Sequence, residues 1–247
     1  ILTVRTLVAV FDRVGDLYGV SNESRVLIAE ELAKARRLDD RAALLLATTG
    51  SDCLSLPECS LLDERTVLQA VDRMVQGLSS TEKENLADLE PCPLKCLFLR
   101  NCGHALSDKA AVHLATRISA LEVLGLTGCY KLNDESFQKL MQPFLDAGQD
   151  SFLRELDLSA NSRLRSGSME AIARLVTLES LTLNDAIHLT DKDMQVLVGT
   201  QSEPVAGAEK LLPKLKHISL NGLINITDQC LIPLVSCYGS QLNTIDI

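Results

Sequence analysis

Aliphatic residues recur along this chain at uneven offsets that are the same from one segment to the next. The segment 94–102 has leucine at its positions 1, 4 and 6 and cysteine at position 9, which gives the pattern L-x-x-L-x-L-x-x-C. The offsets return at starts 121, 153, 178, 215 and 242, and a degenerate copy starts at 51. From 94 onward the starts are 27, 32, 25, 37 and 27 residues apart. The shorter spacings fall in the range of leucine-rich repeats, about 20 to 29 residues.

The second half of each unit carries a helix-start signal. A Ser, Thr or Asn followed by Asp precedes apolar residues at helical spacing in four units, at 107–108, 133–134, 190–191 and 227–228. The short polar side chain accepts hydrogen bonds from free N–H groups of the first turn, and the Asp complements the helix dipole. The unit starting at 153 lacks the Asp, and we expect Ser166 or Ser168 to cap its helix.

These two halves predict one strand and one helix in each repeat. Positions 4 and 6 point into the core because side chains alternate along a strand. No unit buries its own apolar face alone, so neighbouring units stack. The expected fold is an α/β, right-handed leucine-rich repeat solenoid over 51–247, with parallel strands on the concave face and helices outside. It has about seven repeats, the last one truncated. The segments 144–152 and 199–214 are expected to be inserted loops.

Residues 1–50 do not follow the repeat. Their apolar residues stand at helical spacing, and Ser21 or Asn22 is placed to cap the second helix. Because the end of a solenoid needs a cover over its core, this segment is expected to be a helical N-terminal cap. The alternative is a docking segment for an adaptor protein, and both roles are compatible. The chain starts without Met and stops inside a strand pattern, so we expect both ends to continue in a longer protein.

The cysteines indicate structural roles and not catalysis or metal binding. Cys59, Cys102 and Cys129 share repeat position 9 and are expected to be buried structural residues. Cys92 and Cys96 form a C-x₃-C pair, but the sequence has no second pair at a spacing that suits zinc. No catalytic motif combines a nucleophile with a base, so we expect no enzyme activity, no metal and no cofactor. Without a secretory signal, disulfides are not expected.

Composition limits the partners further. Of 247 residues, 46% are hydrophobic and 3% aromatic, and the formal net charge is −9. Direct nucleic-acid binding is not expected, because phosphate contacts need clustered Lys and Arg and single strands need aromatic platforms. No apolar run is long enough to span a membrane. These features favour protein partners.

The strand positions that face away from the core predict where a partner binds. Positions 3, 5 and 7 of each repeat should face the concave surface. Phe and Arg are frequent interface anchors, which favours a binding role for the face as a whole. The alternative is that these are ordinary solvated strand residues. The predicted protein-binding residues are Phe98, Arg100, Thr127, Glu155, Asp157, Thr182, Asn184, His217 and Asn221.

Two resemblances follow from these residues. The pattern L-x-x-L-x-L-x-x-C followed by L-[STN]-D resembles the cysteine-containing leucine-rich repeats of F-box/LRR proteins, the substrate receptors of cullin-type ubiquitin ligases, over 51–247. The segment "VGDLYGVSNESRVLIAEELAKARRLDDRAALLLA", followed by "CLSLPECSLLDE", resembles the Rad-seven-like DNA repair proteins. Residues 1–50 contain no F-box sequence, which suits the second group better.

The narrower resemblance implies a nuclear, non-enzymatic substrate receptor in nucleotide excision repair. Its implied partners are an Elongin C-like adaptor and its cullin, a substrate protein, and an ATP-dependent repair translocase. The family's basic or zinc-binding N-terminal region has no counterpart in these 247 residues, so no DNA contact is carried over. The alternative is a general leucine-rich repeat scaffold or signalling adaptor without a ubiquitin or repair role.

Overall fold

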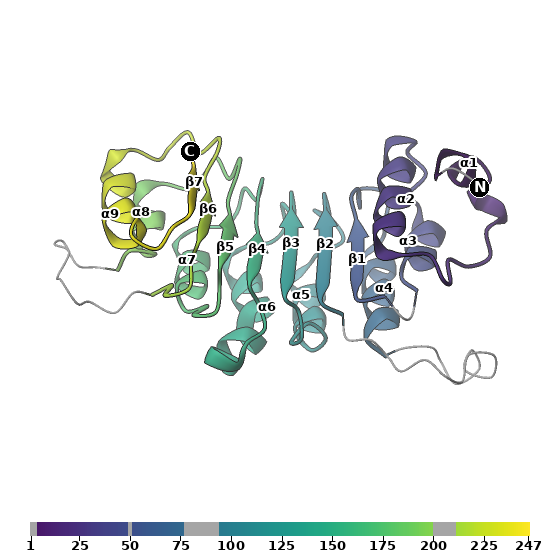
Figure 1. Cartoon of the computed structure of the whole chain (residues 1–247), viewed down its shortest axis with the longest axis horizontal. Coiled ribbons are helices and arrows are strands. Elements are labelled where there is room, and N and C mark those ends of the chain that lie inside the picture. The colour runs from purple at the N-terminus through teal and green to yellow at the C-terminus, as the bar shows by residue number, and fades with distance from the viewer. Residues whose placement is uncertain (1–3, 49–50, 77–93, 200–210) are drawn as a thin grey trace.

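The repeats fold into one curved sheet. The computed structural model describes residues 4–48, 51–76, 94–199 and 211–247. In these ranges seven parallel strands form a single sheet in sequence order (Figure 1). They are β1 (Cys53–Leu56), β2 (Cys96–Arg100), β3 (Val123–Thr127), β4 (Glu155–Asp157), β5 (Ser180–Thr182), β6 (His217–Ser219) and β7 (Thr244–Asp246).

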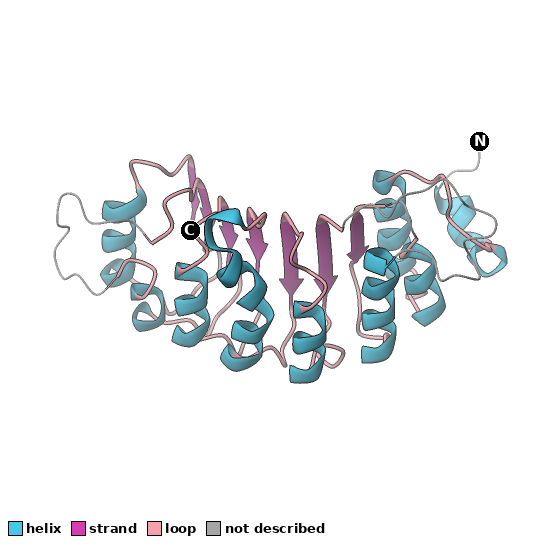
Figure 2. Ribbon diagram, turned by 90° about the horizontal axis from the view of Figure 1, so that it is seen from below, coloured by secondary structure: helices cyan, strands magenta, loops and turns pink. Residues whose placement is uncertain are grey.

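Helices follow the strands and line one side of the sheet. Figure 2 shows the strands on the inner, concave side of the arc and the helices on its outer side, as the sequence predicts. The expected α/β leucine-rich repeat solenoid is therefore confirmed. The repeat helices are α4 (Glu64–Gln76), α5 (Asp108–Ala115), α6 (Asp134–Ala147), α7 (Ser166–Ala173), α8 (Asp191–Gln195) and α9 (Asp228–Tyr238).

The strand register follows the leucine pattern. Position 4 of each repeat pairs with position 4 of the next, so one buried row runs from Leu54 to Ile218 and ends at the half-buried Ile245. Position 6 forms a second buried row from Leu56 to Leu220. Each fully buried leucine contributes about 2 kcal/mol through the hydrophobic effect, so these rows hold successive repeats together.

Position 8 turns the chain out of the strand. Its residue has a positive φ in five successive repeats: Asn101, Gly128, Ala160, Asp185 and Gly222. The first four donate their backbone N–H to the position-7 carbonyl of the next repeat, at 2.7–2.9 Å. A Cβ on Gly128 would lie 2.6 Å from the Asn101 Oδ1 atom. Glycine is therefore favoured at 128, because it adopts a positive φ at the least cost and leaves room for the Asn101 side chain.

Position 9 lies under this turn and is buried. Cys59, Cys102 and Cys129 have 0% exposure, which agrees with their expected structural role. In the fourth repeat Asn161 replaces cysteine with 1% exposure. Its Nδ2 donates to the carbonyls of Leu126 (2.6 Å) and Leu158 (2.8 Å), and its Oδ1 accepts from the Cys129 N–H (2.9 Å). The amide thus satisfies backbone groups of two repeats that would otherwise be buried without partners.

The helix of the fourth repeat is capped from outside. The expectation that Ser166 or Ser168 caps α7 is wrong, because α7 has no side-chain cap of its own. The Asp134 carboxylate, from the first turn of α6, instead accepts from the N–H of Arg165 (2.8 Å), Gly167 (3.1 Å) and Ser168 (3.1 Å). A charged acceptor at this end also complements the dipole of α7.

Asp134 belongs to a recurring arrangement. The first residue of a helix accepts the N–H of the next repeat's cap at Glu64 (from Ser107, 3.2 Å) and at Asp191 (from Thr227, 2.8 Å). Two other caps use their own helix: Asn133 N–H donates to Ser136 Oγ, and Thr190 N–H donates to Asp193 Oδ2, both at 3.0 Å. Cap hydrogen bonds therefore link some neighbouring repeats, whereas other helices are capped within their own repeat.

The expected loop at 144–152 is also wrong. Helix α6 continues to Ala147 and is followed by a 3₁₀ helix, η3 (Gly148–Asp150). The reason is that Phe144, at 1% exposure, extends the buried helical stripe of Phe137 and Leu140. Most of the second expected loop, 200–210, lies outside the described residues.

The N-terminal segment is helical and packs against the first repeat. It contains α1 (Val4–Ala9), a 3₁₀ helix η1 (Phe11–Arg13), α2 (Asn22–Lys34) and α3 (Asp40–Leu46). Ser21 caps α2 by accepting from the Ser24 N–H. Helix α2 lies beside β1 (Figure 1), where Asn22 Nδ2 donates to Asp52 Oδ1 at 2.6 Å. Its buried residues join the same core as the leucine rows.

Candidate functional site

The concave face is built from the outward positions of the strands. Register places position 3 of each repeat in one row, from Cys53 to Thr244, and position 5 in a second row, from Ser55 to Asp246. The described helices lie on the opposite side of the sheet and do not cover this face (Figure 2). Because the sheet is curved, side chains from several strands can contact the same bound segment.

The N-terminal part of the face is apolar. Phe98 is half-buried, and its ring lies over Gly125: a Cβ on that glycine would be 2.6 Å from Phe98 Cδ1. Gly125 is buried for this reason, which the alternation of strand side chains does not predict. Phe98 therefore lies flat on the sheet. With Val123 and Cys96 it forms an apolar floor, which we call the Phe98 patch.

Acidic side chains follow on β4. Glu155 is exposed and makes no ion pair or hydrogen bond through its side chain within the described residues. Asp157 is held by its neighbours, since it accepts from the Ser159 N–H (2.9 Å), the Ser159 hydroxyl (2.6 Å) and the Thr127 hydroxyl (3.2 Å). The structure thus brings the predicted residues Thr127 and Asp157 together. Glu155 remains available to a partner.

The C-terminal part of the face is polar and nearly uncharged. Asn184 Oδ1 accepts from the Ser219 hydroxyl (2.8 Å) and from the Asn221 N–H (2.9 Å). His217 hydrogen-bonds through Nδ1 to Thr244. The predicted residue Thr182 lies in the position-5 row, between Asp157 and Ser219. This region offers hydrogen-bonding groups in place of charge.

The last predicted residue, Arg100, is exposed at the end of β2. It makes no ion pair within the described residues and lies outside the rows that contain Glu155 and Asp157. The prediction also omitted β1 and β7, which add Cys53, Ser55, Thr244 and Asp246. The signal for β1 was present in the degenerate repeat at 51–59, which has the same offsets.

The basic residues at the start of the strands are paired with acids. Lys95 pairs with Glu122 at 3.0 Å. Glu179 accepts from Lys216 at 2.5 Å and lies 3.8 Å from Arg154. The hydrogen bond from Lys216 lowers the pKa of Glu179. This edge of the sheet is therefore nearly neutral.

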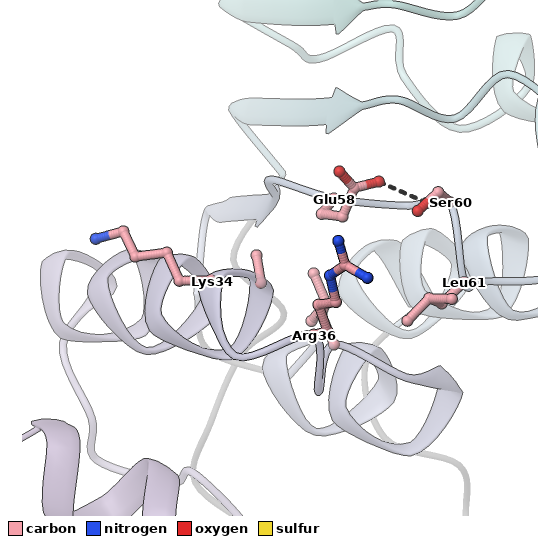
Figure 3. A pocket seen from close by; sticks show the side chains of 7 residues that line it. Lys34, Arg36, Glu58, Ser60 and Leu61 are labelled. Atoms are coloured by element: carbon pink, nitrogen blue, oxygen red, sulfur yellow. Dashed lines mark hydrogen bonds between the residues drawn. The ribbon is translucent and has the colours of Figure 1, made fainter.

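A cavity of about 400 Å³ lies where the N-terminal helices meet the first repeat (Figure 3). Lys34 at the end of α2 and Arg36 just after it line one side, and the turn after β1 supplies Glu58, Ser60 and Leu61. Glu58 is occupied, because it accepts from the Ser60 N–H (2.9 Å) and from Asn101 Nδ2 (3.0 Å). Burial raises the pKa of Glu58, but these hydrogen bonds outweigh it and lower that pKa.

The described residues form no metal site, and two buried thiols away from the concave face are protonated. Within the described ranges, no group of three His, Cys, Asp or Glu side chains is arranged to hold a metal ion. Burial raises the pKa of Cys129 to about 12 and that of Cys230 to about 11, so both thiols are protonated at neutral pH. Across the part of the chain that the structure describes, no helix combines the length and apolarity needed to cross a membrane.

The fold and the uncovered strand face define the class of this protein: an α/β solenoid of the leucine-rich repeat type. Among solved structures, the chain is similar to the crystal structure of the Rad7 and Elc1 complex in yeast. The two are 15% identical with a TM-score of 0.40, and the match covers 98% of this chain and 75% of that chain. Comparison with family models and with curated protein sequences found no match.

Proposed function

We propose that this chain is a non-enzymatic protein-recognition module that binds a segment of a partner protein on its concave strand face. One observation carries the proposal: among the described residues, one whole side of the sheet carries no helix and presents side chains that change from apolar to acidic to neutral polar along the strands. A concave surface formed by paired strands can bind an extended segment along several repeats.

The side chains of the face favour one kind of segment. The Phe98 patch offers an apolar floor on β2 and β3, and the free carboxylate of Glu155 lies on the adjacent strand. An apolar residue next to a Lys or Arg matches this pair of features. Buried apolar contact supplies the affinity, and the charge sets the register of the segment on the face.

The more specific role that we propose is substrate receptor of a cullin-type ubiquitin ligase in nucleotide excision repair, acting in the nucleus. Its support is the sequence resemblance described above. In this role, residues 1–50 contact the adaptor and the concave face binds the substrate. An ATP-dependent translocase is a further partner in this role. The alternative is a general scaffold or signalling adaptor, which shares the concave binding face and lacks the adaptor contact.

A peptide-display selection against the immobilised chain tests the recognition role. We expect enriched sequences with an apolar residue beside Lys or Arg, and weaker binding of those peptides by Glu155→Lys. The matched control is Glu170→Lys, which makes the same charge change at an exposed residue of α7 in the same repeat and should bind like the wild type. No enrichment, or equal loss in both variants, would contradict the recognition role.

Co-expression with an Elongin C-like adaptor tests the ligase role. The proposal expects the adaptor to co-purify with the chain, and expects a chain lacking residues 1–20 to lose it. Peptide binding without any adaptor binding would favour the scaffold alternative.

A further inference from the structure

Two cysteines lie side by side on the concave face. Cys53 on β1 and Cys96 on β2 are register partners, and each occupies position 3 of its repeat. Their side chains therefore leave the sheet on the same side. Neighbouring strands are about 4.8 Å apart, and disulfides form across Cα separations of about 4.4–6.8 Å. The backbone thus already holds the two residues within the range of a bond.

The two thiols are neighbours and are accessible. Each is close enough to shift the pKa of the other. Both residues are half-buried and free. Cys59, Cys102 and Cys129 also neighbour one another, but they are completely buried, so a reagent in solution does not reach them. Access combined with pairing distinguishes Cys53 and Cys96 from these three.

We propose that Cys53 and Cys96 form an oxidation site, a dithiol that a neutral peroxide converts into a disulfide joining β1 to β2. The bond would lie on the concave face, because both side chains leave the sheet on that side. It would join the strand against which α2 packs to the strand that carries Phe98.

The chemistry balances with hydrogen peroxide as the oxidant. The Cys96 thiolate attacks one peroxide oxygen, the O–O bond breaks, and hydroxide leaves and takes up the proton that Cys96 had released, forming water. Cys96 is then a sulfenic acid. The Cys53 sulfur attacks the Cys96 sulfur, the S–O bond breaks, and the second water carries away the Cys53 proton. Two thiols and one peroxide become one disulfide and two waters. Cys96 is the first nucleophile because the neighbouring Cys53 acts to lower the pKa of Cys96, whereas Cys96 acts to raise the pKa of Cys53.

The surroundings select the oxidant and set the rate. Burial, with nearby negative charge, raises the pKa of Cys53 to about 11 and also raises that of Cys96. The carboxylates that contribute are those of Glu23, Asp52, Glu122 and Glu155. The reaction is therefore slow at neutral pH and accelerates with rising pH, since only the thiolate attacks. The same negative charge repels anionic oxidants such as oxidised glutathione and leaves neutral peroxide as the suitable reagent.

The test is peptide mapping of the purified whole chain after exposure to hydrogen peroxide. We expect one linked pair of peptides containing Cys53 and Cys96, formed faster at pH 8.5 than at pH 7. Cys53→Ser should abolish the link and leave Cys96 as a sulfenic acid that dimedone traps. If Cys53→Ser does not fold, the wild-type map alone decides.

Two further cysteines provide matched controls. Cys92 lies outside the described residues and is close to Cys96 in sequence, so Cys92→Ser must retain the link. Cys237 is half-buried on α9, and Cys237→Ser should also retain it. A link between Cys92 and Cys96, or oxidation of Cys237 as fast as that of Cys96 without a link, would overturn the proposal.

Discussion

Replacing Asp134 with alanine is expected to destabilise a helix to which this residue does not belong. Asp134 begins α6, yet its carboxylate accepts three backbone N–H groups at the start of α7 and the hydroxyl of Ser168 at 2.5 Å. Helix α7 has no side-chain cap of its own. The variant therefore removes the external cap and leaves Ser168, which is completely buried, without this acceptor.

The expected loss in the free energy of unfolding is about 3 kcal/mol. Loss of a helix cap to alanine costs about 1 kcal/mol, and up to 2 in proteins. Leaving a buried polar group without a partner costs about 1–3 kcal/mol more. Water can reach part of the site because Asp134 is only half-buried, so the two terms together stay near 3 kcal/mol.

Urea unfolding and amide hydrogen exchange measure this effect, with Asp108→Ala as the matched control. Asp108 begins α5 as Asp134 begins α6, but the cap of α6 is satisfied by its own Ser136. The control should lose about 0.5 kcal/mol from the α5 dipole alone. In Asp134→Ala, the amides at the start of α7 should exchange roughly a hundredfold faster, since 1.4 kcal/mol is a factor of ten. Equal losses in the two variants would refute coupling through caps.

Three other outcomes follow from buried or strained positions. Asn161→Ala should lower the unfolding free energy by about 3 kcal/mol in urea titrations, because the N–H of Cys129 and two carbonyls lose their partner; a loss below 1 kcal/mol would count against that role. Gly128→Ala should cost about 2 kcal/mol, and adding Asn101→Gly should restore about half of it by removing the clash, while no recovery would leave only backbone strain. Stability should fall as pH rises from 9 towards 12, because burial raises the pKa of Cys129 from 9.0 to about 12 and the unfolded chain loses that proton first. Cys129→Ala should flatten this fall in pH-dependent unfolding, and an unchanged slope would assign it to another group.

The repeat offsets were sufficient to predict the sheet. Leucines at positions 1, 4 and 6 carry the inward pattern, and the cysteine at position 9 marks the turn. Both are local signals, because each repeat places the same residue types at the same distance from its strand. The outward rows of the concave face follow from the same alternation. The concave placement of Thr182 and Glu155 could therefore be assigned before any coordinates.

Contacts between repeats could not be predicted in the same way. The ring of Phe98 over Gly125 and the capping of α7 by Asp134 each join residues about 27 to 34 positions apart. A local pattern carries no information on which side chain of the previous repeat fills the space. The expected loop at 144–152 failed for a different reason: the 32-residue spacing between the repeat starts at 121 and 153 suggested an inserted loop, while Phe144 has enough buried contact to continue the helix.

Photo-crosslinking from two positions tests the central claim, that the concave strand face is the surface that binds protein. A benzoylphenylalanine would replace Thr182 on β5 in one variant and Glu170 on the outer α7 in the other, and each would be irradiated with a selected peptide bound. Binding on the strand face gives a covalent adduct from position 182 and none from position 170. An adduct only from position 170 would place binding on the helical side of the solenoid.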